Sequence, residues 1–359
     1  MQAALLVQPG EVAITKVPRP QAGPSEVVVE VRSCGVCATD VKKFAGVSKT
    51  PKLPFILGHE PAGVIVEVGE GVGPELASGT RVAVAPVFTC GHCFGCSSGL
   101  AHSQGMGMCE NYQVLGHSID GAFAEYVVAP VSHVYPIPDT LSFRDAALIE
   151  PVAACANGAL RAARVPPGTV VVIGAGFMGL VTIQLLAILG SRVISSDLQE
   201  ERRRLALKLG ADAAFDPGAE DVVESVKAAT NGRGADGVVC AVGGKAVTEQ
   251  GLAMLARGGS LVLLASGPGG TRFEVDLNKM HYDQSVITGS VSYTGMGYQW
   301  SMELLSRGIL DVDTLITAVG SLQDTQRFLE MTRDLQGLKK VILIEPGESR
   351  VEPLRGSGE

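Results

Sequence analysis

The pattern of apolar and polar positions along the chain changes near Leu141. Before that residue, apolar positions form short runs separated by glycine and proline, as at Glu26–Val31, Gly63–Val68, Arg81–Val84 and Ala124–Val128. Short β-type runs at regular spacing, each bounded by turn-forming residues, are typical of all-β domains. Because many short strands of this kind close into barrels, this part of the chain predicts a barrel-like β domain.

Beyond Leu141 the pattern becomes helical and then alternates. Within Leu141–Ala163, Ser142 is expected to cap a helix that carries Ala146, Ala147 and Leu148. From Thr169 onward, strand-like runs alternate with helical segments, and the first run is continuously apolar, like a strand buried on both faces. The expected strands are Val170–Ile173, Arg192–Ser195, Gly237–Cys240 and Ser260–Leu264, and the expected helices are Leu180–Leu189 and Glu200–Leu209. This alternation predicts a doubly wound parallel α/β domain.

Length and composition agree with two folded domains. The 359 residues are too many for one ordinary core, and 46% hydrophobic against 18% charged residues argues against global disorder. The alternation loosens near Ser290, a last strand is expected at Lys340–Ile344, and the polar tail beyond Glu345 is expected to be disordered.

Charge and hydropathy limit the class of partner. The net charge of −8 argues against nucleic acid as the main partner, although it leaves room for a small anionic substrate. The N-terminus lacks a signal-peptide pattern, and no apolar run reaches the roughly 18 residues of a membrane span. We therefore expect a soluble, cytoplasmic protein without a membrane partner.

Four of the 8 cysteines lie in one segment, at a spacing that allows them to bind one metal ion. Cys90, Cys93 and Cys96 occur at every third position, and Cys109 follows downstream. Four thiolates can hold one zinc in a closed, structural site, which favours a reducing compartment over a disulfide framework. The alternative is four buried free thiols. His92 and His102 lie nearby, and either is a substitute ligand that an all-thiolate site does not need.

A second set of ligand types precedes this cluster. Cys37, His59 and Glu60 offer a thiolate, an imidazole and a carboxylate, which can bind zinc and leave one position open for water or substrate oxygen. Taken alone, His59 is more often a structural histidine than a ligand. Cys34 is the competing thiol, although a small buried side chain is the simpler interpretation of it.

A dinucleotide-binding turn follows the first α/β strand. Gly174-x-Gly176-x-x-Gly179 joins that strand to a helix, where a pyrophosphate can approach the backbone and the helix N-terminus. Asp197 ends the next strand, near the offset at which a carboxylate accepts hydrogen bonds from the ribose and repels a 2′-phosphate. The sequence therefore favours NAD over NADP, with a ligand-free glycine turn as the alternative. Further candidates for cofactor contact are Phe177, Met178, Ser266 and Arg202, the last within an arginine run, Arg202–Arg204, that otherwise reads as a solvated helix face.

Together these motifs resemble the zinc-dependent medium-chain dehydrogenase/reductase family, in its polyol and threonine dehydrogenase branch. The matching segments are Gly58-His59-Glu60-x-x-Gly63-x5-Gly69-x-x-Val72, Gly35-Val36-Cys37-x-Thr39-Asp40, Cys90-Gly91-His92-Cys93-x-x-Cys96 with Met108-Cys109-Glu110-Asn111, and Glu150-Pro151. The resemblance implies a GroES-like β-barrel catalytic domain, residues 1–152 and 292–359, with a structural-zinc lobe at about 88–112. A Rossmann domain, residues 153–291, would be inserted between its two parts.

The resemblance also implies roles for individual residues. Cys37 and His59 would be ligands of the catalytic zinc, with Glu60 and Glu150 as carboxylates around it, and which of the two binds directly stays open. Thr39 would pass the substrate proton outward, and its alternative is a strand residue that bonds locally. The family often has a histidine at the position of Lys42, so the relay would end at Lys42, at the ribose hydroxyls or in water.

One further departure from the family concerns the lobe. The family usually places seven residues between the third and fourth cysteines, whereas twelve lie between Cys96 and Cys109. The extra residues, within Ser97–Met108, are expected to bulge from the lobe and to alter oligomer contacts or the substrate entrance.

The implied activity is NAD-dependent oxidation of a secondary alcohol of a polyol, sugar alcohol, cyclitol, aminocyclitol or hydroxy amino acid, with two zinc ions per chain and a homotetramer or homodimer. Alternatives are a zinc alcohol dehydrogenase or aldehyde reductase acting on a simpler or pathway-specific alcohol, a zinc-free alkene reductase, a non-catalytic NAD-binding protein and a zinc-ribbon interaction module. Tyr293, Tyr298 and Trp300 would line the cleft or belong to a core or interface.

Overall fold

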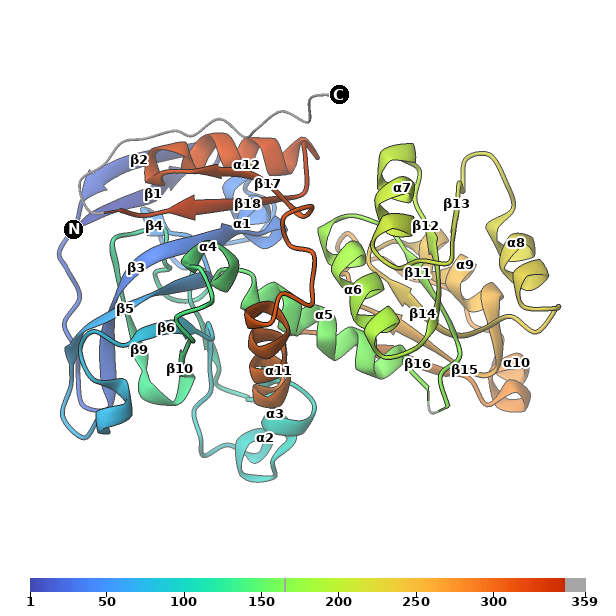
Figure 1. Cartoon of the computed structure of the whole chain (residues 1–359), viewed down its shortest axis with the longest axis horizontal. Helices are drawn as coiled ribbons and strands as arrows, with labels where there is room; N and C mark the ends of the chain where they lie inside the picture. The colour runs from blue at the N-terminus through green and yellow to red at the C-terminus, as the bar shows by residue number, and fades with distance from the viewer. Residues whose placement is uncertain (165, 346–359) are drawn as a thin grey trace. The chain divides into compact units, whose positions relative to one another are not determined.

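The computed structural model describes residues 1–164 and 166–345, and they fold into two compact units (Figure 1). Unit 1 contains Met1–Glu150 and the chain from Tyr298 onward, and unit 2 contains Pro151–Gly297. The domain limits expected from the sequence, residues 152 and 292, lie a few positions from these divisions. The expected disorder beyond Glu345 lies outside the described residues.

Unit 1 is built mainly of β-strands, as predicted. Its largest sheet has the order β10-β6-β5-β3-β18-β17, and β9 also pairs with β3. The strands are β3 (Glu26–Val36), β5 (Glu60–Val68), β6 (Arg81–Val84), β9 (Tyr126–Pro130), β10 (Val134–Pro136), β17 (Ile316–Gly320) and β18 (Lys339–Leu343). A second sheet contains β1 (Gln2–Gln8), β2 (Glu11–Lys16) and β4 (Phe55–Ile56) in the order β2-β1-β4.

The strand β3 is longer than expected and organises the unit. It pairs with β5, β9 and β18, so both ladders of its backbone are occupied. Its alternate residues Val27, Val29 and Val31 are fully buried in the core, where Phe328 of α12 (Thr325–Arg333) also packs. This central position leads the chain through buried Cys34 to Cys37, which stands at the N-terminus of α1 (Ala38–Phe44).

The cysteine lobe is a small excursion from unit 1. It contains β7 (Val87–Phe88), α2 (Phe94–Ser97), α3 (Leu100–Ser103), the 3₁₀ turn η2 (Met106–Met108) and β8 (Gln113–Val114). The segment expected to bulge is therefore ordered into α3 and η2. The remaining short 3₁₀ turns of unit 1 are η1 (Pro74–Leu76), η3 (Val131–His133) and η4 (Leu322–Asp324).

The helix expected after Ser142 is shorter than predicted, because it ends before Leu148, and a second helix follows it. Ser142 caps α4 (Phe143–Ala146) by accepting a 3.1 Å hydrogen bond from the Asp145 amide. A new helix, α5 (Ile149–Ala162), follows and carries Glu150 in its first turn. The chain returns to unit 1 through α11 (Gly295–Ser306).

Unit 2 is the predicted doubly wound domain. Its six parallel strands have the order β13-β12-β11-β14-β15-β16, so the strand order reverses between β11 and β14. The strands are β11 (Thr169–Ile173), β12 (Arg192–Ser196), β13 (Ala213–Phe215), β14 (Ala235–Cys240), β15 (Leu255–Leu263) and β16 (Val286–Gly289). The helices are α6 (Phe177–Ile188), α7 (Glu200–Lys208), α8 (Val222–Ala229), α9 (Lys245–Met254) and α10 (Leu277–Asp283). Ligands of such folds bind beyond the carboxyl ends of the strands at the point of reversal.

Within the described ranges, no helix combines the length and the apolar character that a bilayer crossing requires.

Candidate active site

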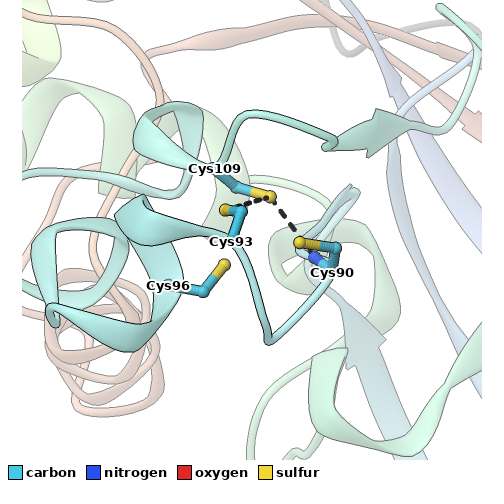
Figure 2. A group of neighbouring side chains, drawn as sticks. All are labelled: Cys90, Cys93, Cys96 and Cys109. Atoms are coloured by element: carbon cyan, nitrogen blue, oxygen red, sulfur yellow. Dashed lines mark hydrogen bonds between the residues drawn. The ribbon is translucent and has the colours of Figure 1, made fainter.

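The structure brings the four cysteines of the lobe together (Figure 2). Their sulfur atoms all lie within 4.8 Å of one another, and the Cys93 and Cys109 sulfurs are 3.8 Å apart. Cys93 caps the N-terminus of α2, Cys96 lies within that helix, and Cys109 follows η2. Backbone amides support the sulfurs: the Cys90 amide donates to Cys109 at 3.3 Å and the Glu110 amide to Cys93 at 3.4 Å.

The chemistry of this cluster fits a cation. The backbone amides of His92 and Cys93 lower the pKa of Cys90 to about 6, whereas burial raises that of Cys96 to about 12. The thiols therefore do not ionise together without a positive charge among them. Four thiolates at this separation suit one tetrahedral zinc. All eight cysteines of the chain are free thiols.

A second cluster forms where β3 ends and β5 begins. The ligand atoms of Cys37, His59 and Glu60 lie within 4.8 Å of one another, and His59 and Glu60 are buried. The antiparallel pairing of β3 with β5 sets Gly35 opposite Glu60, two residues before Cys37. The sheet register thus brings the thiol that follows β3 close to the carboxylate that begins β5.

Asp40 holds this second cluster in place and was not among the candidates. Its fully buried carboxylate accepts a hydrogen bond from the Cys37 amide at 3.0 Å and another from the Gly58 amide at 3.1 Å. It also contacts Nδ1 of His59 at 3.2 Å. This contact leaves Nε2 for a metal ion, since a ligating histidine normally donates its other nitrogen to a carboxylate. The sequence signal was an acidic residue three positions after Cys37.

The electrostatics of the second cluster also fit a cation. Burial alone would lower the pKa of His59, but the Asp40 carboxylate and the Cys37 thiolate raise it well above its usual value. The imidazole therefore keeps a proton where a metal ion would otherwise balance the charge. Glu60 forms an ion pair with Lys339 of β18, and its buried Oε1 has no hydrogen-bond partner among the residues that the structure describes. One buried carboxylate oxygen is thus left for a further positive group.

Glu150 stands outside this three-residue group. Burial raises the pKa of its carboxyl to about 7; the charge of His59 opposes this shift and the charge of Glu60 adds to it. The pKa of Glu150 therefore depends on the charges of two members of the cluster, His59 and Glu60. Thr39 is half-buried in the first turn of α1, so the alternative that it lies in a strand is wrong. Lys42, further along this helix, is exposed.

Two residues near the cluster were missed by sequence reasoning. The ring of His117 stands edge-on to the ring of His59, with centroids 5.8 Å apart and planes at 85°. Burial, aided by the charges of His59 and Lys43, lowers the pKa of His117 to about 4. The buried ammonium of Lys43 donates to the main-chain oxygens of Lys49 at 2.7 Å and of His117 at 3.2 Å.

The dinucleotide turn has the geometry that a pyrophosphate needs. A Cβ at Gly179 would lie 1.8 Å from the Gly174 main-chain oxygen, so only glycine allows this packing. At Gly176 no atom of the described ranges lies within 4 Å of where a Cβ would be, and this residue is the N-cap of α6. The backbone amides at the start of α6 are therefore open to an anion. Phe177 and Met178 form the first turn of α6 and are partly buried.

Asp197 lies at the end of β12 and supports this turn. Its Oδ2 accepts a hydrogen bond from the Ala175 amide at 2.7 Å, and its Oδ1 accepts one from the Gln199 amide at 2.8 Å. Nη1 of Arg202 is 4.0 Å from Oδ2. Ser266 is exposed beyond the end of β15, and its main chain lies beside Gly243 beyond the end of β14.

The three arginines of α7 do not form one solvated face. Arg204 does, since its side chain is 73% exposed and pairs with Glu200. Arg202 and Arg203 are each only 17% exposed, and Arg203 pairs with Asp216 at 2.9 Å while donating to the Asp197 main-chain oxygen. The sequence interpretation therefore holds for one arginine and is wrong for two, because β12 and β13 present acceptors to the helix.

The aromatic residues near the return to unit 1 are mainly core residues. Tyr293 and Tyr298 are at most 1% exposed, and Tyr298 contacts the ring of Tyr135 with centroids 4.8 Å apart. Trp300 is partly buried.

Comparison with known proteins finds a matching family model for each of the two units. Residues 23–139 match the model of the alcohol dehydrogenase GroES-like domain, and residues 177–307 match that of the zinc-binding dehydrogenases. The chain is 31% identical to sorbitol dehydrogenase of Bacillus subtilis (strain 168), over 96% of this chain and 97% of the relative. It is 33% identical to L-threonine 3-dehydrogenase of Pyrococcus horikoshii, over 88% and 90%. The crystal structure of alcohol dehydrogenase TADH from Thermus sp. ATN1 superposes with a TM-score of 0.87 at 27% identity, covering 96% of this chain and 100% of that one.

Proposed function

The chain belongs to the zinc-dependent medium-chain dehydrogenase/reductase family, and from this premise we propose that it oxidises a secondary alcohol of a polyol, sugar alcohol, cyclitol, aminocyclitol or hydroxy amino acid to the ketone. The observation that carries the proposal is the cluster of Cys37, His59 and Glu60. It combines three ligand types with a histidine already oriented by a buried carboxylate. A structural site would need no such open arrangement.

Cys37 and His59 would hold the catalytic zinc, and Glu60 or Glu150 would add a carboxylate. When bound, zinc supplies Lewis acidity that lowers the pKa of a substrate hydroxyl, and NAD supplies the hydride acceptor. Asp40 contacts Nδ1 of His59, so Nε2 is the nitrogen that would bind the metal. Burial raises the pKa of Glu150 to about 7 in the metal-free protein, and the charge of a bound zinc ion would favour its carboxylate form.

Thr39 is the residue that would take the substrate proton outward. It stands two positions after Cys37 on the first turn of α1, and it is half-buried, so its hydroxyl can connect the site with solvent. Lys42 lies one turn further along the same helix and is exposed. We assign to it the outer end of the path, with water and the ribose hydroxyls as the alternatives.

The four cysteines of the lobe would hold a second, structural zinc. All four positions of that site are filled by sulfur, so it has no place for substrate. Two zinc ions per chain follow from this assignment. The free thiols also support a reducing, cytoplasmic location.

The cofactor site lies at the turn between β11 and α6, with Gly174, Gly176 and Gly179 admitting the pyrophosphate. Asp197 favours NAD over NADP because its carboxylate would meet a 2′-phosphate with like charge. Arg202 lies close enough to Asp197 to approach the same ribose. Ser266, Phe177 and Met178 complete the proposed contacts.

Self-association is the remaining part of the proposal. The strand β16 is an edge of the sheet of unit 2, and apolar residues on and near it, Val286 and Val291, are 49% and 65% exposed. An exposed edge with apolar side chains is a template for pairing with another chain. We propose that a second copy covers it, giving a homodimer or a dimer within a homotetramer.

The test is NADH production by zinc-loaded protein across polyols, cyclitols, aminocyclitols and L-threonine, with NADP in parallel. Turnover of one substrate class supports the proposal and names that class. A simpler alcohol as the only substrate would favour the alternative of a zinc alcohol dehydrogenase. Silence with both cofactors at about two zinc ions per chain would contradict catalysis and favour a non-catalytic NAD-binding protein.

A further inference from the structure

His117 belongs to a loop that is fastened to the segment carrying His59. The main-chain oxygens of residues 56–58 accept hydrogen bonds from the amides of Gly121, Phe123 and Ala122, at 2.8, 2.9 and 2.9 Å. A Cβ at Gly116 would come within 2.7 Å of the Gly58 backbone. The residue before His117 is therefore pressed against the residue before His59.

A buried lysine holds the same loop from the other side. Lys43 is 3% exposed, and its ammonium donates to the main-chain oxygen of His117. It also donates to the main-chain oxygen of Lys49, which belongs to the loop after α1. One side chain thus ties together two loops, and the position of the His117 ring beside His59 does not depend on the ring itself.

The hydrogen bonds of His117 differ from those of a core histidine. His133, in the same unit, accepts from the Thr89 amide through Nε2 at 3.1 Å and contacts the Ser132 hydroxyl through Nδ1 at 2.9 Å. Among the described residues, neither ring nitrogen of His117 has a hydrogen-bond partner, although the ring is partly buried against a candidate metal ligand. Because the ring is partly exposed and the backbone fixes its position, its two nitrogens are open to water or to a ligand that enters beside His59.

We propose that His117 is a specificity-determining residue that hydrogen-bonds a substrate hydroxyl on the carbon next to the one oxidised. This inference rests on the proposed function. A neutral imidazole has one donor and one acceptor nitrogen, so it matches a hydroxyl, which can both donate and accept. In a vicinal diol one oxygen can occupy the open position at the metal while its neighbour reaches the adjacent side chain. The preferred substrates are therefore vicinal diols or polyols rather than simple alcohols.

The experiment compares a diol with the alcohol that lacks its second hydroxyl. The pair is 2,3-butanediol and 2-butanol, together with the best polyol of the substrate panel and its deoxy analogue. His117→Ala is expected to lower kcat/KM for the diols by roughly 10-fold or more while the mono-alcohols change by less than about 2-fold. His117→Gln should recover part of the loss, because an amide also offers a donor and an acceptor. His281→Ala, which removes an exposed histidine on α10 of unit 2, is the control.

A second measurement does not use turnover. In cobalt-substituted protein, the visible absorption bands report ligand binding at the metal, and 2,3-butanediol should shift them with a higher apparent Kd in His117→Ala. Equal losses on diol and mono-alcohol, or none, would overturn the inference while leaving the proposed function intact. A wild-type protein that turns over no alcohol and shows no spectral change would overturn both.

Discussion

Glu60 and Lys339 form an ion pair in the interior of unit 1, where their side chains are 0% and 3% exposed. The two residues are far apart in the sequence. They meet because β5, which contains Glu60, and β18, which contains Lys339, are both neighbours of β3 in the sheet. The Lys339 ammonium also donates to the Val36 main-chain oxygen at 3.2 Å. The pair therefore neutralises the carboxylate nearest the proposed metal and ties it to the strand that leads to Cys37.

Removing this lysine should destabilise the metal-free protein. Lys339→Met leaves the Glu60 charge buried without its partner, which costs about 3–5 kcal/mol. The loss should be smaller in zinc-loaded protein, because the metal offers Glu60 another positive charge. Thermal unfolding in the presence of a chelator measures the loss of stability in the metal-free protein, and thermal unfolding with zinc measures it in the zinc-loaded protein. Lys340→Met is the matched control, since that buried ammonium donates to the Gln336 and Leu338 main-chain oxygens and its loss should not depend on zinc. Equal zinc dependence in the two variants would contradict this account.

The ligands of the proposed catalytic zinc can be tested separately from the cofactor site. Cys37→Ser and His59→Ala should each reduce turnover roughly 10³-fold or more, with about one zinc fewer per chain. NAD binding, measured by calorimetry, should persist because its proposed site lies in unit 2. Cys34→Ala removes a neighbouring, fully buried thiol that is not in the ligand group, and it should retain both zinc and turnover. Retained turnover in Cys37→Ser would remove the assignment.

The four-cysteine cluster should support the fold rather than the chemistry. Cys93→Ala opens that site, and because structural zinc binding is coupled to folding, we expect the melting temperature to fall by roughly 10 °C. His102→Ala changes an exposed side chain of the same lobe and should leave the melting temperature unchanged. A Cys93→Ala protein that keeps two zinc ions and wild-type stability would show that the lobe does not need the metal.

Asp197 should set the preference between the two nicotinamide cofactors. Asp197→Ala removes the proposed ribose acceptor and should raise the Kd for NAD roughly 10–100-fold. The Kd for NADP should change less, because the lost ribose contact is offset by the loss of charge repulsion. Some loss of affinity for both cofactors is expected, since the same carboxylate accepts a hydrogen bond from the Ala175 amide in the turn. An equal increase in both Kd values would mean that Asp197 only supports the turn.

Acid should destabilise unit 1 through His133. Burial lowers its pKa to about 4, below its ordinary value of 6.5, and the Thr89 amide occupies Nε2 as a donor, so the folded state holds the neutral ring. The unfolded chain therefore binds the extra proton as the pH falls below 6.5. The contribution of the neutral His133 ring to the free energy of unfolding is therefore fully present above pH 6.5, and ~3 kcal/mol of it is lost as the pH falls to 4.

The pH dependence of the melting temperature tests this account. His133→Gln should flatten the decline between pH 6.5 and pH 4, whereas His281→Gln, at an exposed position, should follow the wild type. A slope in His133→Gln equal to that of the wild type would show that other groups carry the acid sensitivity.

Local patterns were enough to predict the architecture. The alternation of strand and helix after Thr169 predicted the doubly wound unit, and the short runs before Leu141 predicted the β unit, because burial on one face or on both leaves a period in the sequence. The pattern did not predict β13 or β16, which have only three and four residues. The helix expected after Ser142 to carry Ala146, Ala147 and Leu148 ends at Ala146, and a second helix begins at Ile149.

The sequence by itself determined which groups are available for chemistry. Cysteines at metal spacing, the glycine turn and the His59-Glu60 pair are local features, so they can be found without coordinates. Only the tertiary structure decided how these groups are supported. Asp40 orients His59, Lys339 pairs with Glu60 and Lys43 holds the loop of His117, and each contact joins segments that are separate in sequence. A buried charge or polar group is stable only with a partner, and here the partner comes from another segment of the chain. A local sequence pattern does not show which segments the fold brings together.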